Sequence, residues 1–295
     1  MKDLYMKTLI LLLISCSLVY MFSAQAKQVE EHKLSNFCYL PTQSNVSYAA
    51  VLELEKSQAT HLIQYGLNPL QYGELWLPDS KDANYKHPLV IFVHGGCWLN
   101  EFDISHTHAF STALANNGYA VWSIEYRRTG DQGGGWPGSY QDIEKAIDFV
   151  PNLRDYPIDL RKIALLGHSA GGHLALLAGS ERRASLSAVI GLAAIYDIEQ
   201  YSKGNNSCQT AASKFMGGDA NAVPEQYRAA NPSKQALHPN TILMHGSQDT
   251  IVPIQQTEST KHRVVEIEDA GHFDMIYPGT QTFQVLLKKL ASIFK

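Results

Sequence analysis

The sequence lacks several features that would assign it to a specialised class of protein. Charged residues make up only 18% of its 295 residues, the formal net charge is −4 at pH 7, and no block of lysine and arginine is present. Proteins that bind nucleic acid through charge need such residues to neutralise phosphates, so nucleic acid is not an expected partner. No spacing of cysteine and histidine fits a zinc site, and we expect no bound metal. No repeat or low-complexity linker is visible either, which favours an ordinary globular chain.

The N-terminus has the features of a secretory signal peptide. Lys2 and Lys7 form a basic start, Leu9 to Phe22 is almost wholly apolar, and Ala24-Gln25-Ala26 supplies small residues at a cleavage site. The apolar run is shorter than the roughly 20 residues that a membrane-spanning helix needs. An uncleaved anchor, or lipoprotein processing at Cys16, is the alternative.

Cleavage would divide the chain into a signal peptide, residues 1–26, and one domain, residues 27–295, in the periplasm or outside the cell. The charge balance gives no reason to expect a polybasic surface, so we do not expect the cleaved domain to bind a membrane. It keeps three cysteines, Cys38, Cys97 and Cys208, and an odd number in an oxidising compartment suggests one disulfide bond and one free thiol. Cys97 lies within a motif described below. We therefore expect Cys38 to pair with Cys208, although pairing cannot be read from sequence alone.

Short apolar runs rich in β-branched residues alternate along the chain with segments of helical periodicity. Such runs are typical of strands buried on both faces of a parallel sheet. The predicted strands are residues 89–93, 120–124, 162–166, 188–194, 241–244 and 264–267. The predicted helices are residues 106–116, 141–150 and 283–293. This order predicts an α/β fold with a mostly parallel sheet and helices on both faces.

Two further segments complete the predicted organisation. Residues 61–77 resemble an antiparallel strand pair that turns near Asn68-Pro69. Residues 199–230 have weak periodicity and several glycine and asparagine residues, and they stand where a small cap or insertion over the substrate is expected.

The strongest chemical signal is Gly167-His168-Ser169-Ala170-Gly171, a G-x-S-x-G motif between a predicted strand and a predicted helix. A sharp turn from strand to helix leaves no room for side chains at the flanking positions, which explains the glycines. The turn lifts the serine hydroxyl above the sheet and directs the N-terminus of the helix at a developing oxyanion. We interpret Ser169 as a catalytic nucleophile. The alternative is a glycine-rich turn without chemistry.

A second motif, His94-Gly95-Gly96-Cys97-Trp98, directly follows the predicted strand 89–93. Acyl transfer builds negative charge on a carbonyl oxygen, and glycines allow backbone N–H groups to face that charge. We assign the oxyanion hole to the N–H groups of Gly96, Cys97 and Ala170. His94 is expected to brace the loop, and the alternative for the motif is a tight turn with Trp98 in the core.

Two residues in later loops complete a predicted triad. Asp249 and His272 each follow a predicted strand, and the order Ser169, Asp249, His272 is that of α/β hydrolases. A serine needs an adjacent base, and an acid holds the imidazole of that base in place. Asp197 is the rival acid, with a capping role as its alternative. Asp274 is expected to be a solvated loop residue.

These motifs resemble the α/β-hydrolase superfamily, nearest to its esterase/lipase branch with the HGG-x-W motif. Residues 125–128, 133–138 and Asp142 are similar to bacterial members related to kynurenine formamidase and to small acyl esterases. The resemblance implies an eight-stranded sheet, no cofactor and an acyl-serine intermediate. The chain differs from members similar to hormone-sensitive lipase by having Cys97 in place of a third glycine.

The combined evidence predicts a secreted serine hydrolase that cleaves carboxylic esters of small acyl or aryl substrates. An arylformamidase or amidase with the same machinery is the alternative, although a signal peptide fits a cytosolic formamidase poorly. A catalytically silent hydrolase fold that serves as a binding module is a third hypothesis. Trp98, Trp136 and Tyr126 either line an acyl or aryl pocket or pack in the core.

Overall fold

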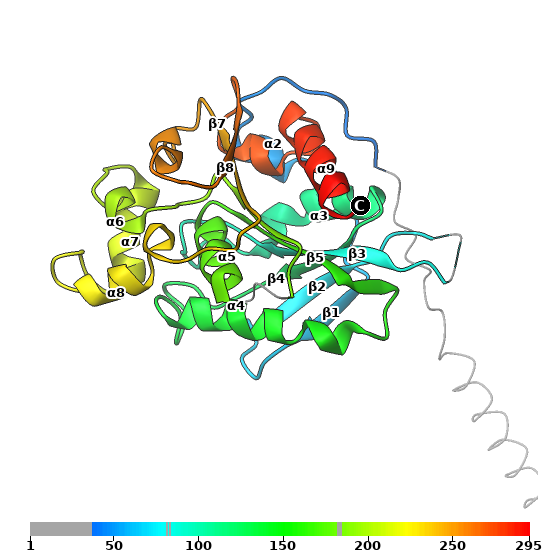
Figure 1. The fold of residues 1–295 in the computed structure, drawn as a ribbon, viewed down its shortest axis with the longest axis horizontal. Coiled ribbons are helices and arrows are strands. Elements are labelled where there is room, and N and C mark those ends of the chain that lie inside the picture. The colour runs from blue at the N-terminus through cyan, green and yellow to red at the C-terminus, as the bar shows by residue number, and fades with distance from the viewer. Residues whose placement is uncertain (1–36, 81, 83, 182–184) are drawn as a thin grey trace, which may run out of the picture. The chain divides into compact units, whose positions relative to one another are not determined.

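The computed structural model describes residues 37–80, 82, 84–181 and 185–295, so the predicted signal peptide lies outside the described residues. These residues form an eight-stranded sheet in the order β1-β2-β4-β3-β5-β6-β7-β8 (Figure 1). The strands are β1 (His61–Gln64), β2 (Tyr72–Trp76), β3 (His87–Val93), β4 (Ala120–Ile124), β5 (Ile158–His168), β6 (Ala188–Leu192), β7 (Thr241–Gly246) and β8 (Arg263–Ile267).

The sheet is mostly parallel. β1 pairs with β2, and β2 with β4, in antiparallel register, whereas β3, β4, β5, β6, β7 and β8 pair in parallel. Both the α/β-hydrolase fold and the antiparallel pair within residues 61–77 are therefore confirmed. Because the parallel strands point the same way, the loops after β3, β5, β7 and β8 meet at one edge of the sheet, where ligands bind in open α/β folds.

Helices connect most of the strands, and short 3₁₀ segments lie between several of these helices and strands. The α-helices are α2 (Tyr48–Leu52), α3 (His108–Asn116), α4 (Gly138–Asp148), α5 (Ala170–Glu181), α6 (Ile198–Tyr201), α7 (Ser207–Met216), α8 (Pro224–Ala229) and α9 (Gln281–Ile293). The 3₁₀ segments are η1 (Ile104–Thr107), η2 (Val150–Leu153), η3 (Pro232–Lys234), η4 (Ile254–Thr257) and η5 (Phe273–Ile276). No helix within the described ranges has the length and apolar character needed to cross a membrane.

Alternate side chains of each central strand enter two separate cores. In β3, Leu89, Ile91 and Val93 pack with residues of α4 and α5, while Val90 and Phe92 pack with residues of α3 and α9 on the other face. Successive side chains of a strand point to opposite faces, so a strand covered on both sides must be apolar throughout. This is why residues 89–93 of β3 form a continuous apolar run in the sequence.

Most element boundaries lie within a few residues of the predicted ones, and one difference bears on the site. We predicted that the strand after α5 extends to Ala194, but β6 ends at Leu192. Ala193 has a φ of +47°, a left-handed conformation that stops an extended strand. The predicted cap region, residues 199–230, contains the short helices α7 and α8, and the start of α7 borders the cavity described next.

Candidate active site

Ser169 stands alone between the end of β5 and the start of α5, with a φ of +55°. The glycines around it are required by space. A Cβ atom at Gly167 would lie 2.3 Å from the carbonyl oxygen of Gly171, and one at Gly171 would lie 2.2 Å from that of His94. The backbone therefore makes a sharp turn that only small neighbours allow. A left-handed serine is typical of the strained turn that presents a nucleophile.

The structure brings Asp249 and His272 together from the loops after β7 and β8. His272 Nδ1 lies 2.7 Å from Asp249 Oδ2, and both side chains are buried. Asp249 Oδ1 accepts further hydrogen bonds from the backbone N–H groups of Ile251 and Val252 at 2.9 and 2.8 Å. Burial by itself would raise the pKa of Asp249, but His272, His245 and the backbone bonds together hold it below its usual value. The carboxylate is thus kept as an ionised acceptor that orients the imidazole.

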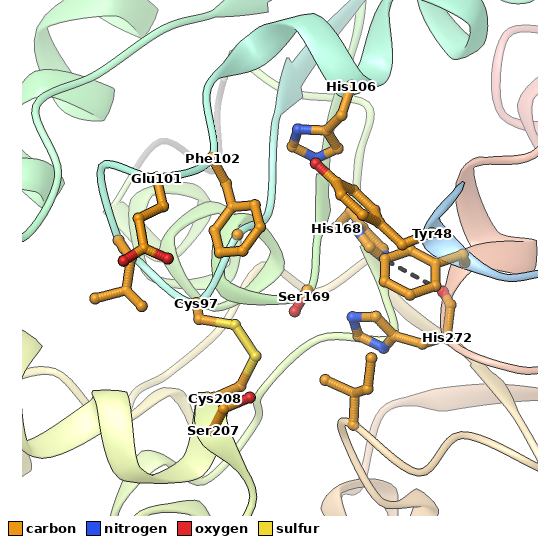
Figure 2. Close-up of a pocket in the computed structure, with 14 residues that line it drawn as sticks. Tyr48, Cys97, Glu101, Phe102, His106, His168, Ser169, Ser207, Cys208 and His272 are labelled. Carbon is orange, nitrogen blue, oxygen red and sulfur yellow. Dashed lines mark hydrogen bonds between the residues drawn. A yellow bond between two sulfur atoms is a disulfide. The ribbon is translucent and has the colours of Figure 1, made fainter. Parts of the chain in front are cut away.

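Ser169 and His272 line the same cavity, which has a volume of about 380 Å³. Figure 2 shows Ser169 at its centre, with the Cys97–Cys208 disulfide on one side and the ring of His272 on the other. Within the described part of the chain no hydrogen bond joins Ser169 Oγ to His272. Catalytic hydrogen bonds are often long in the absence of substrate and tighten on binding. Ser169 and His272 therefore border one cavity, and Asp249 is joined to this cavity through its hydrogen bond with His272.

The loop after β3 turns through three consecutive residues of positive φ. These values are +112° at Gly96, +53° at Cys97 and +59° at Trp98, and for residues with a side chain such a conformation costs about 1–2 kcal/mol each. No described residue accepts a hydrogen bond from the backbone N–H of Gly96 or Cys97. Ala170 is the first residue of α5, where N–H groups have no intrahelical acceptor. These three predicted oxyanion donors are thus free to bind a ligand.

His94 braces this turn, as predicted. Its Nδ1 lies 2.8 Å from the carbonyl oxygen of Gly95 and its Nε2 lies 3.1 Å from Glu125 Oε1. The carbonyl oxygen of Gly95 can only accept a hydrogen bond. Burial by itself would raise the pKa of Glu125, but His94, Arg128 and the backbone N–H of Ile104 together lower it, so this side chain is an accepting carboxylate. The two contacts fix the imidazole of His94 between Glu125 and the carbonyl group of Gly95. The contact with His94 fixes the direction of the carbonyl group of Gly95. The N–H of the same peptide unit, which belongs to Gly96, therefore points in the opposite direction.

The disulfide prediction was wrong. Cys97 pairs with Cys208, at a Cα–Cα distance of 4.9 Å, and the exposed Cys38 is unpaired. We had expected Cys97 to stay free because it belongs to the oxyanion motif. The side chain of Cys97 instead reaches Cys208 in the first turn of α7. Tertiary packing of the cap segment supplies the partner.

Aromatic side chains that the sequence did not single out form the other walls of the cavity. Tyr48 from α2 lies with its ring centroid 5.2 Å from that of Phe273 and 5.9 Å from that of Phe102. Phe102 and Phe273 could have been found because each lies close to a motif, whereas Tyr48 belongs to an N-terminal segment that carries no motif. The cavity is therefore apolar around a polar centre, which suits a small organic substrate.

The three aromatic residues considered for the pocket pack in the core instead. Trp98 is fully buried and stacks on Phe215, with ring centroids 4.9 Å apart. Trp136 contacts Phe215 and Tyr140. Tyr126 is fully buried, and its hydroxyl donates to the carbonyl oxygen of His94 at 3.0 Å. These side chains support the oxyanion loop from behind, and none lines the cavity that contains Ser169.

The two remaining acids have structural contacts. Asp197 caps α6 by accepting from the backbone N–H of Gln200 at 2.9 Å, which is the alternative role considered for it. The expectation for Asp274 was wrong, because its side chain is fully buried. It accepts hydrogen bonds from the backbone N–H groups of Asn45, Val46 and Gly271, each at 3.0 Å. Asp274 thereby joins the N-terminal segment to the loop that carries His272.

A second histidine touches this loop. His168, next to Ser169, is buried with its Nε2 3.1 Å from the carbonyl oxygen of His272. Burial and the neighbouring His272 lower its pKa well below the ordinary value. It is therefore neutral, and it fixes the backbone of His272 without supplying charge. Within the described ranges, no group of three or more His, Cys, Asp or Glu side chains is placed to hold a metal ion.

Fold and site together define a class. An eight-stranded sheet, a serine on a strand-to-helix turn and an Asp–His pair at the same sheet edge identify the chain as a member of the α/β-hydrolase superfamily, on its esterase/lipase side. Residues 74–264 match the BD-FAE family, and the chain belongs to that family.

Relatives agree with this assignment. Esterase LipC of Mycobacterium tuberculosis is 29% identical over 244 residues, which cover 72% of this chain and 60% of LipC. The chain thus spans less than two thirds of the length of that relative. Among solved structures, esterase B of Lactobacillus Rhamnosis superposes with a TM-score of 0.68 at 19% identity, covering 83% of this chain and 89% of the other. A truncated carbohydrate esterase from gut microbiota gives a TM-score of 0.69 at 20% identity, covering 81% and 96%. At such identities these two structures show the fold alone.

Proposed function

We propose that this protein is a serine hydrolase that cleaves carboxylic esters of small acyl or aryl substrates through an acyl-serine intermediate. The observation that carries the proposal is the buried Asp249–His272 pair, 2.7 Å apart, at the cavity that also contains Ser169. An esterase among the relatives, LipC, supports the choice of ester substrates.

The proposed reaction follows from the positions of these groups. His272 Nε2 takes the proton of Ser169 as the hydroxyl attacks the ester carbonyl, and Asp249 stabilises the imidazolium that forms. Negative charge develops on the carbonyl oxygen, where the N–H groups of Gly96, Cys97 and Ala170 can stabilise it. His272 then gives the proton to the leaving alcohol. Water, activated by the same imidazole, releases the acid and restores the serine.

The test compares two serine variants of purified protein on p-nitrophenyl acetate and butyrate. We expect Ser169→Ala to lose turnover, with a residual rate at least about 10³-fold below that of the parent. The matched control is Ser123→Ala, since Ser123 is equally buried but lies in β4, away from the cavity. Equal turnover by Ser169→Ala and the parent protein would overturn the serine assignment.

An arylformamidase or amidase would use the same groups on a poorer leaving group. The segment that suggested it, residues 133–138, makes a backbone hydrogen bond from Trp136 to Phe215 and does not line the cavity. Esters are therefore the favoured substrates. Comparing N-formylkynurenine with short esters distinguishes the two activities, because a formamidase would prefer the former. Covalent labelling by a fluorophosphonate probe tests the third hypothesis, since a catalytically silent binding module would not react.

We also propose that the chain is exported to the periplasm or outside the cell. The Cys97–Cys208 disulfide supports this, because disulfides persist mainly in oxidising compartments. Mass spectrometry of protein recovered from the native host should find a mature N-terminus at Lys27. Recovery of chains that begin at Met1 from the cytoplasm would contradict export.

A further inference from the structure

Cys97 occupies a backbone position that suits glycine. Its φ of +53° lies in the left-handed region, and so does the φ of +59° at Trp98 beside it. Glycine adopts this region freely, whereas a Cβ atom disfavours it. This chain therefore carries a side chain at a strained point of a turn that lines the cavity.

The disulfide fixes that strained residue to a rigid anchor. Cys208 lies in the first turn of α7, between Asn206 and Gln209, which exchange the hydrogen bonds of a capping box. The side chain of Asn206 also donates to the carbonyl oxygen of Ile251 at 3.0 Å, in the loop that follows Asp249. The anchor is thus held to the same loop as the acid. A bond from Cys97 to this anchor restrains the turn from outside the motif.

Both sulfur atoms belong to the site. Cys97 and Cys208 line the cavity with Ser169, and Figure 2 shows the disulfide facing the serine. Both cysteines are half-buried, so a small reductant can reach them. Opening the disulfide would therefore act directly on the oxyanion turn.

We propose that the Cys97–Cys208 disulfide is a positioning device for the oxyanion turn, because it holds Cys97 in a conformation that only glycine adopts freely. The inference rests on the proposed function. When the disulfide is opened, Cys97 relaxes toward negative φ, and its N–H turns away from the developing oxyanion. Substrate binding depends on the other walls of the cavity. The loss therefore falls on kcat more than on KM, because the donors act in the transition state.

Two variants separate positioning from simple cross-linking. Cys208→Ser opens the disulfide but keeps a side chain at position 97. We expect kcat for p-nitrophenyl acetate to fall by about 10- to 100-fold, somewhat less than the loss of one whole oxyanion donor, with KM changed by less than about threefold. The double variant Cys97→Gly with Cys208→Ser also lacks the bond but gives the turn a residue that tolerates positive φ. We expect it to recover most of the parent kcat.

Reduction of the intact enzyme provides an independent measurement. One dithiothreitol molecule gives two electrons and two protons to the disulfide, which becomes two thiols while the reagent closes to its cyclic disulfide. We expect kcat to fall in parallel with the appearance of thiols and to return on reoxidation. The double variant should be insensitive to the reagent. Cys38→Ser is the control, since the exposed Cys38 is unpaired and lies away from the cavity, and it should respond as the parent does.

The outcomes decide between the alternatives. The proposal is wrong if full reduction leaves kcat unchanged, or if the double variant is as slow as Cys208→Ser. The latter result would indicate a cross-link that matters only for stability. If Cys208→Ser does not fold, as judged by circular dichroism, the reduction series on the folded parent still decides. A parent protein that neither hydrolyses esters nor reacts with a fluorophosphonate contradicts the proposed function itself. An active parent whose variants keep the parent kcat contradicts only this inference.

Discussion

His94 and Glu125 are paired in the interior, with Nε2 of His94 3.1 Å from Oε1 of Glu125 and neither side chain more than 1% exposed. The pair lies behind the oxyanion turn, and the second ring nitrogen of His94 holds the carbonyl of Gly95. The carboxylate of Glu125 thus holds an imidazole that contacts a peptide carbonyl, and the carboxylate of Asp249 likewise holds the imidazole of His272. In the proposed mechanism, the first pair sets the orientation of the backbone and the second serves proton transfer.

Two substitutions of His94 distinguish its hydrogen bonds. Asn places its amide nitrogen near the Nδ1 position and can still donate to Gly95, whereas Gln places it near Nε2 and keeps only the bond to Glu125. We expect His94→Asn to retain at least about tenfold more kcat than His94→Gln, because oxyanion donors are sensitive to small displacements. The measurement is kcat and KM on p-nitrophenyl acetate. Equal kcat values for the two variants would mean that the bond to Gly95 is unimportant for turnover.

Gly96 tests the oxyanion turn directly. An added Cβ atom would lie 2.4 Å from Cβ of Phe102, and the φ of +112° is itself unfavourable for alanine. We expect Gly96→Ala to lower kcat by about 10²-fold through displacement of the N–H groups. Gly118→Ala is the matched control, since Gly118 has a φ of +88° but open space around its Cβ position. The control should lose about 1–2 kcal/mol of stability and keep its kcat; a similar loss of kcat in both variants would argue against a local effect.

Buried histidines predict that the protein loses stability in mild acid. Burial lowers the pKa of His106 to about 3 and that of His173 to about 4. In the unfolded chain these groups have a pKa of about 6.5, so below that pH the unfolded state binds more protons than the folded state. Their contribution is fully present above about pH 6.5 and is lost as the pH falls toward the folded pKa. The free energy of unfolding should therefore decrease steadily from about pH 6.5 to about pH 4.

A single substitution isolates one of these protons. His173 Nε2 lies 2.6 Å from the carbonyl oxygen of Ala230, and His173→Gln cannot take up a proton in this pH range. We expect urea unfolding of the variant to have a slope of stability against pH that is smaller by up to about 1.4 kcal/mol per pH unit. The exposed His61, changed to Gln, should alter the slope far less. An unchanged slope in His173→Gln would show that His173 can be protonated without unfolding.

Asp274 is expected to contribute to stability through backbone hydrogen bonds. Asp274→Asn replaces one carboxylate oxygen with a donor, so at least one N–H among Asn45, Val46 and Gly271 loses its acceptor. We expect the free energy of unfolding to fall by about 1–3 kcal/mol, measured by urea denaturation. The exposed Asp269, changed to Asn, should stay within about 0.5 kcal/mol of the parent. A neutral effect of Asp274→Asn would show that water can satisfy the freed groups.

The amino-acid sequence by itself determined the parts of this protein that depend on neighbours in the chain. Apolar runs placed the strands, because the part of a strand that is covered on both faces must be apolar at every position, as residues 89–93 of β3 are. The glycines around Ser169 and in the turn at Gly96 identified the two motifs, because the close backbone approach there admits no side chain. The order of Ser169, Asp249 and His272 along the chain then indicated which residues the sheet edge brings together.

Only the tertiary structure decided the contacts between distant segments. The partner of Cys97 depends on where α7 packs, the burial of Asp274 depends on the N-terminal segment that covers it, and Tyr48 reaches the cavity from that same segment. None of these pairs leaves a local pattern, because a disulfide or a buried carboxylate requires only proximity in space. Such proximity is set by the summed packing of the whole core, to which each residue of the pair contributes little.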